Sequence, residues 1–203
     1  AGGPGSGKTF VTRSAFGGTG LRMINSDNAF EIALKKNNLS LKMPEDEAEA
    51  RDIVRARAKA TTGNIMDLSI KGRLGMVVDG TGRDYDKIKN QVAQLRQLGY
   101  DCYMIFVNTS LDVALERNSK RERSVPEYIT RKSWEGVQSN IGKFQNLFGI
   151  SNMVIVDNSK DDKELTTVVM NKVGKAVRSL LSNKIKSYTA KRWMATERKL
   201  RRR

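Results

Sequence analysis

The sequence contains no histidine and only one cysteine among its 203 residues. Without histidine, zinc sites and acid–base catalysis by an imidazole are largely excluded. A lone cysteine, Cys102, cannot form a disulfide within the chain, and its apolar neighbours favour a small core residue over a nucleophile. The sequence also lacks any run of eighteen apolar residues and any visible secretory signal, so we expect no membrane span and a reducing, cytoplasmic location.

Acidic side chains are scarce relative to basic ones: 22 Asp and Glu stand against 37 Lys and Arg, a formal net charge of +15. Much of this charge is local, because residues 184–203 carry nine Lys and Arg against the single Glu197. Such a balance favours nucleic acid or another polyanion as partner, although a solvated tail that aids solubility is the alternative. The candidate nucleic-acid contacts are Lys191, Arg192, Arg198 and Arg201.

A glycine-rich stretch, GGPGSGKT at residues 2–9, matches the phosphate-binding pattern G-x-x-x-x-G-K-[ST] without a gap. Glycines let the backbone approach an anion closely, and successive N–H groups then form a nest for phosphate oxygens. The lysine of the pattern reaches the β- and γ-phosphates, and the hydroxyl that follows it holds Mg²⁺. A mobile glycine-rich turn is the alternative. The predicted triphosphate-binding residues here are Gly3, Gly5, Ser6, Gly7, Lys8 and Thr9, with Thr9 also a metal ligand.

Only Ala1 precedes this loop, whereas a buried strand ordinarily leads into one. Losing a central strand would leave its neighbours with unpaired edges. We therefore expect that the natural chain extends further at this end. The expected organisation is a P-loop kinase domain over residues 1–183, followed by a basic segment over residues 184–203.

Apolar runs alternate with helical patterns along the chain. The predicted strands are residues 21–24, 74–79, 103–107 and 153–156. The predicted helices are residues 9–15, 29–36, 48–60, 64–71, 84–97, 111–118, 126–144 and 165–185, followed by the basic segment as a helix or tail. This alternation predicts an α/β fold, with a parallel sheet covered by helices on both faces, as in P-loop NTPases and kinases.

Two carboxylates follow predicted strands, at the edge of the sheet where such folds bind ligands. Asp27 is the candidate base that accepts the proton of an attacking hydroxyl; capping the next helix is its alternative role. Asp79 is a candidate metal ligand, and it could instead orient the acceptor or cap a turn.

A basic run at residues 116–123 indicates a lid over the site. Arg117 and Arg121 are four residues apart, so on a helix they would share a face. Two guanidinium groups aimed at one site can neutralise the oxygens of a phosphoryl group in transfer. A solvated charged helix is the alternative.

The loop, the Asn25-Ser26-Asp27 element and the basic run followed by Val125-Pro126 together resemble the kinase domains of phage 5′-polynucleotide kinases. Residues 76–84, MVVDGTGRD, look more like the wider group of zeta-toxin-type kinases. The resemblance covers about residues 2–158 and implies a cytoplasmic enzyme of a bacterium or a phage-infected cell that uses ATP and Mg²⁺. It also implies that Asp27 activates the acceptor hydroxyl, that Arg121 stabilises the transition state, and that Arg117 lies over the nucleotide.

Two departures from that family bear on the acceptor. Phe30 stands where the polynucleotide kinases have an arginine that helps to hold the nucleic-acid end, and the phosphatase domain that follows in them is absent. The favoured function is phosphoryl transfer from ATP to a polynucleotide 5′-hydroxyl. A zeta-toxin-like kinase of a nucleotide sugar or other small acceptor, and a non-catalytic nucleotide-binding protein associated with nucleic acid, are the alternatives.

Overall fold

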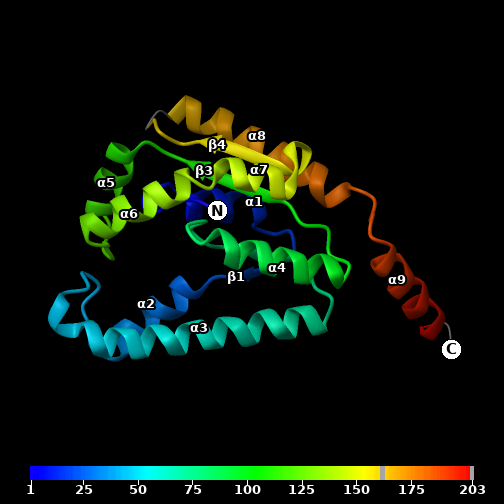
Figure 1. Cartoon of the computed structure of the whole chain (residues 1–203), viewed down its shortest axis with the longest axis horizontal. Helices are drawn as coiled ribbons and strands as arrows, with labels where there is room; N and C mark the ends of the chain where they lie inside the picture. The colour runs from blue at the N-terminus through cyan, green and yellow to red at the C-terminus, as the bar shows by residue number, and fades with distance from the viewer. Residues whose placement is uncertain (161–162, 202–203) are drawn as a thin grey trace.

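Four short parallel strands form the centre of the molecule, which is described by a computed structural model over residues 1–160 and 163–201. Strand β1 (Arg22–Ile24) pairs with β2 (Met76–Val78), and β3 (Met104–Asn108) pairs with β4 (Met153–Asp157). All four strands lie within or next to the predicted stretches, and helices connect them (Figure 1). The expected α/β fold with parallel strands is therefore confirmed.

The first two residues lie between these two strand pairs. The Ala1 nitrogen donates to Ile105 O at 2.6 Å, and Val107 N donates to Ala1 O at 2.8 Å, which is the hydrogen-bond pattern of a parallel neighbour of β3. Gly2 N donates to Thr81 O at 3.0 Å, just beyond β2. Residues 1 and 2 thus link the two-stranded sheet β1–β2 to the two-stranded sheet β3–β4.

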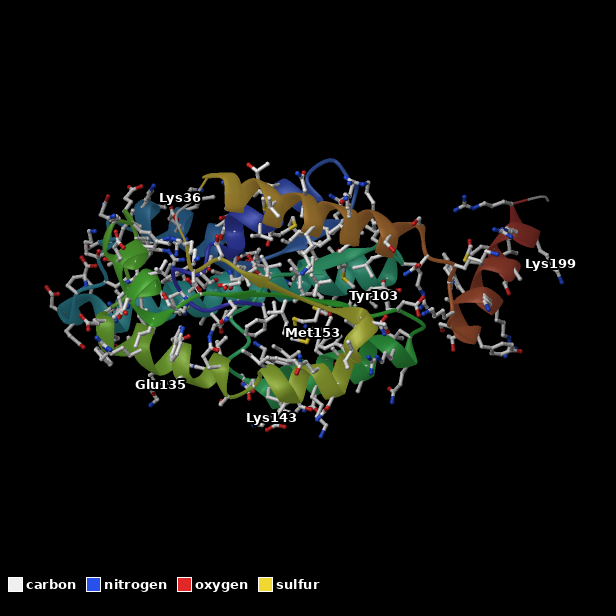
Figure 2. The ribbon with its side chains drawn as sticks, turned by 90° about the horizontal axis from the view of Figure 1, so that it is seen from above. Lys36, Tyr103, Glu135, Lys143, Met153 and Lys199 are labelled. Atoms are coloured by element: carbon white, nitrogen blue, oxygen red, sulfur yellow. The ribbon has the colours of Figure 1, made fainter. Side chains whose placement is uncertain are left out.

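Helices cover both faces of the β3–β4 pair, because its side chains alternate between two apolar cores. On one face Met104 and Phe106 pack with α4 (Tyr85–Gln97) and α7 (Ile141–Phe148). On the other, Val107 and Val156 pack with α1 (Lys8–Phe16) and α8 (Lys163–Ser182). This layering, seen from above in Figure 2, gives the helices on both faces that the sequence predicted.

A third core joins α2 (Ser26–Lys36) to α3 (Ala48–Lys71), which run together along one side of the molecule (Figure 1). Its buried members are Phe30, Leu34, Met43, Val54 and Ala58. The remaining short elements are η1 (Glu45–Glu47), α5 (Leu111–Ser119), α6 (Glu127–Gln138), η2 (Ile150–Asn152) and α9 (Tyr188–Leu200).

Two predicted helix boundaries are wrong. The two helices expected over 48–60 and 64–71 are one helix, α3, because a single interior glycine, Gly63, costs only about 1 kcal/mol relative to alanine. Conversely, the long helix expected over 126–144 breaks between α6 and α7. The buried Asn140 side chain donates to Gly82 O and Arg83 O at 3.1 and 2.8 Å, which ties the break to the loop after β2.

The predicted basic segment contains helix α9, which projects from the body of the molecule (Figure 1). Residues 202–203 of that segment lie outside the described part of the chain. Within the ranges 1–160 and 163–201, no helix combines the length and the apolar character needed to cross a bilayer.

Candidate active site

The glycine-rich loop wraps tightly between α5 and the end of β4. Gly5 and Gly7 have φ of 75° and 82°, in the left-handed region that favours glycine. A Cβ at Gly5 would lie 2.2 Å from Ala114 O of α5, and one at Gly7 would lie 2.3 Å from Asn158 Nδ2. Gly7 also caps the amino end of α1, so the first turn of that helix opens onto the loop. The backbone path therefore requires glycine at both positions, and it ends at a helix terminus that favours anions.

A chain of polar contacts runs from this loop to the amino end of α2. Lys8 Nζ lies 2.8 Å from Asp79 Oδ1, and Asn25 Nδ2 donates to Asp79 Oδ2 at 2.7 Å. Asn25 Oδ1 in turn accepts from Asp27 N at 2.7 Å. The side chains of Lys8 and Asp79 are only 13% and 3% exposed. The structure thus connects the lysine of the loop to the Asp79 carboxylate and, through Asn25, to the backbone amide of Asp27.

Asp27 lies in the first turn of α2, and the cap of that helix is Asn25. The alternative role of Asp27 as a helix cap is therefore filled by another side chain. The Asp27 carboxylate is 48% exposed and faces Arg123, with 3.4 Å between Oδ1 and Nη2. This carboxylate is therefore accessible from solvent.

Arg123 lies between that carboxylate and an aromatic ring. Its guanidinium carbon is 5.8 Å from the ring centroid of Phe30, and the guanidinium carbon of Arg55 is 5.1 Å from the same centroid. The Arg123 side chain is only 16% exposed. The fold therefore brings one arginine of the basic run at residues 116–123 to Asp27.

The two arginines predicted to belong to a lid, Arg117 and Arg121, have different surroundings. Arg117, on α5, donates from Nη1 to Asn158 O at 2.8 Å, while Asn158 Nδ2 donates to Ser6 O at 2.8 Å. Arg117 is therefore joined to the phosphate-binding loop through one residue.

Arg121 lies beyond the end of α5 and is exposed, with its carbonyl oxygen accepting from Lys42 Nζ at 3.0 Å. The expectation that Arg117 and Arg121 share a helical face is wrong. The helix ends at Ser119 because Asn118 closes a turn, accepting from Val125 N at 3.1 Å and donating to Val125 O at 2.6 Å.

The predicted metal ligands, Thr9 and Asp79, both lie next to Lys8. Thr9 is in the first turn of α1, one residue after Lys8, and Asp79 contacts Lys8 directly. In the described ranges, no three His, Cys, Asp or Glu side chains gather as a metal site. Mg²⁺ commonly takes only one or two protein ligands together with phosphate oxygens and water, so this sparse set suits Mg²⁺ that arrives with a nucleotide.

A model of the AAA_33 family, described as an AAA domain, matches residues 1–143. The chain belongs to this family. No curated protein sequence matches it. Among solved structures, it is similar to a deoxyadenosine kinase from M. mycoides with bound dATP, with 21% sequence identity and a TM-score of 0.44 over 85% of this chain and 95% of that one. This AAA domain has the glycine-rich phosphate-binding loop, the parallel strands and the flanking helices of a P-loop NTPase fold.

Three residues that contribute to the site of this AAA domain had no predicted role: Asn25, Asn158 and Arg123. Asn25 belonged to the Asn25-Ser26-Asp27 element without a role of its own, and Asn158 was visible only as a polar residue after a strand. Arg123 was one of several cations in the basic run. The predicted contacts Lys191, Arg192, Arg198 and Arg201 lie on or next to α9, away from the loop.

Proposed function

We propose that this protein is an ATP-dependent phosphotransferase that moves the γ-phosphate of ATP to an acceptor hydroxyl. The observation that carries the proposal is the polar chain from Lys8 through Asp79 and Asn25 to the start of α2. It supports a site in which Lys8 binds the donor phosphates and Asp27, at the start of α2, faces the acceptor. Phosphoryl transfer needs these two groups close together, one for the donor and one for the acceptor.

Each remaining residue has a role in that reaction. The loop N–H groups, from Gly3 to Gly7, and Lys8 bind the triphosphate. Thr9 and Asp79 would hold Mg²⁺, which neutralises phosphate charge when bound. Asp79 now pairs with Lys8, so we expect this ion pair to separate as nucleotide binds.

The acceptor side of the site consists of a base and cations. Asp27 accepts the hydroxyl proton, and Arg123 holds its carboxylate in place. Arg117 lies next to the loop through Asn158, and Arg121, on the exposed segment, would reach the transferring phosphoryl group when that segment closes. Guanidinium groups in these positions stabilise the charge that develops in the transition state.

A polynucleotide 5′-hydroxyl is the favoured acceptor. It is supported by the net charge of +15 and by the two arginines, Arg55 and Arg123, that flank Phe30 beside Asp27. A small acceptor such as a nucleotide sugar is the second candidate. Position 30 is occupied by Phe30, which is buried in the α2–α3 core, so it offers no charge to the phosphates of a strand. A small molecule would need no binding surface beyond Asp27 and the two arginines.

A transfer assay tests the proposal and separates these acceptors. ATP labelled at the γ-phosphate is incubated with hydroxyl-ended DNA, hydroxyl-ended RNA, nucleosides and nucleotide sugars, each with Mg²⁺. We expect transfer to a hydroxyl-ended strand, abolished in Lys8→Ala and unchanged in Lys59→Ala, an exposed lysine of α3. Normal transfer by Lys8→Ala would rule out the loop as the catalytic cradle. Tight ATP binding without transfer to any acceptor would instead indicate a non-catalytic binding protein.

The Asp27→Asn variant tests the base. We expect it to bind ATP normally and to lose about a hundredfold in turnover, as for a lost general base. Asp52→Asn, on the exposed face of α3, is the matched control and should retain full turnover. If Asp27→Asn turns over as fast as that control, Asp27 does not activate the acceptor.

A further inference from the structure

Helix α9 has two faces of different chemistry. The half-buried residues recur at helical spacing and mark the side toward the body of the protein: Ala190, Met194 and Glu197. The residues on the opposite side of the helix are all exposed. They recur at the i, i+3, i+4, i+7 spacing of a single stripe: 188, 191, 192, 195, 198 and 199. The helix is therefore oriented, with one face docked and the other facing solvent.

Contacts with the region around α4 set this orientation. The Trp193 ring lies with its centroid 5.7 Å from the guanidinium carbon of Arg73. Gly99, with φ of 97°, lies against the first turn of α9, so closely that a Cβ on Gly99 would be 2.9 Å from Ala190 N. Lys186 N donates to Asp101 Oδ2 at 3.3 Å, just before the helix begins. These contacts turn the tryptophan face of α9 toward the body and leave the other face free.

The solvent face combines an aromatic ring with four cations and carries no acidic residue. Tyr188, at its amino end, is 78% exposed and lies one turn before Lys191 and Arg192. Arg198 and Lys199 lie two turns further along, with only the small Ala195 between the two pairs. The single acid of the helix, Glu197, is on the docked side. From Lys191 to Arg198 the helix rises about 10.5 Å, so the four cations form two pairs spread along this face.

We propose that this face of α9 binds single-stranded nucleic acid, with the four cations on its phosphates and Tyr188 stacked on an unpaired base. Cations aligned with an exposed aromatic ring are the combination used by proteins that bind single strands without sequence preference. A duplex would offer the phosphates but no free base face to the tyrosine. The face thus fits a single strand better than it fits a duplex.

This surface is separate from the candidate active site. Figure 1 shows α9 projecting at one end of the molecule, while α2 and α5, which flank the phosphate-binding loop, lie toward the other end. Figure 2 shows the same separation, with Lys199 of α9 and Lys36 of α2 toward opposite ends. The proposed surface would therefore hold the strand away from any reacting hydroxyl. The inference does not depend on phosphoryl transfer.

Fluorescence anisotropy of the full chain with a labelled 20-nucleotide single strand tests the proposal. Four phosphate contacts predict a slope of log affinity against log salt near −2.8, or a loss of about fiftyfold between 50 and 200 mM salt. The double variant Lys191→Ala, Arg198→Ala should flatten the slope to about −1.4, a loss of about sevenfold over that range. The control Lys89→Ala, Lys132→Ala removes the same charge from exposed positions on α4 and α6 and should leave the slope unchanged.

The tyrosine is tested with a conservative pair. We expect Tyr188→Ala to weaken single-strand binding about tenfold and Tyr188→Phe to bind as the unchanged protein does, because the phenyl ring still stacks. Duplex of the same length should bind more weakly and respond to neither substitution at Tyr188.

Any one of three results would overturn the proposal. The first is an equal slope of log affinity against log salt in the two double variants, and the second is equal strand affinity of Tyr188→Ala and Tyr188→Phe. The third is tighter binding of the protein to phosphatidylserine vesicles than to the single strand. Lys8→Ala should bind the strand normally even if it transfers no phosphate. That variant therefore separates a failure of this inference from a failure of the proposed phosphotransferase activity.

Discussion

Replacing Gly5 by alanine tests whether the phosphate-binding loop must pass so close to α5. The added Cβ would meet only backbone atoms of Ala114, at 2.2 Å from the oxygen and 2.8 Å from Cα, so either the loop or the helix must shift. The φ of 75° adds a second cost, about 1–2 kcal/mol for a residue with a side chain. With overpacking worth about 1–3 kcal/mol, Gly5→Ala should lose about 2–5 kcal/mol of unfolding free energy.

Gly20 provides the matched control. Its φ of 77° is nearly the same, but within the described part of the chain no other atom lies within 4 Å of a Cβ there. Gly20→Ala should therefore lose only the backbone cost, about 1–2 kcal/mol. The difference between the two variants isolates the close approach of the loop to α5.

The assay is urea unfolding followed by circular dichroism, with the midpoint and slope fitted for each variant. A titration with ATP then measures nucleotide affinity where both variants are folded. We expect Gly5→Ala to bind at least tenfold more weakly than Gly20→Ala, since its loop is displaced. If both variants lost the same stability and bound ATP equally, the tight path of the loop against α5 would be refuted.

Three further predictions concern single side chains. Asn25→Ala removes the helix cap and the hydrogen bond to Asp79 together, and should lower the unfolding free energy by about 2–4 kcal/mol in the same urea assay. Arg123→Ala should raise the KM for the acceptor and leave ATP affinity unchanged, because Arg123 contacts the Asp27 carboxylate. If Arg123 only stabilised the fold, its loss would weaken acceptor binding and ATP binding equally. Burial raises the pKa of the Cys102 thiol, so at pH 8 less thiolate forms than in free cysteine, and iodoacetamide should react more slowly until urea unfolds the chain.

Much of the fold was predictable because local patterns specify it. The apolar runs around Met76, Met104 and Met153 mark the strands, and intervening helical patterns require parallel crossovers. The same topology predicts that Asp27 and Asp79 lie at the carboxyl edge of the sheet, since each follows a strand. Helix boundaries were less predictable, because Asn140 breaks a helix by bonding to the distant Gly82 and Arg83.

The sequence predicted which residue types the candidate site would contain, but not which side chains would contact each other. Arg121 was expected beside Arg117 on one helix of the basic run. The turn closed by Asn118 separates them and brings Arg123 to Asp27 instead. Periodicity cannot anticipate such a turn, because it depends on one amide side chain reaching both backbone groups of Val125.

The amino-acid sequence alone determined the phosphate-binding loop, the parallel α/β order and the basic character of the last helix, because each depends on residues adjacent in the chain. Tertiary structure decided that Asn25 links Lys8 and Asp79 to α2, and that α9 turns Trp193 inward and its cations outward. Those arrangements depend on contacts between segments far apart in sequence. Such contacts form only when the crossovers and the docking of each helix bring the segments together.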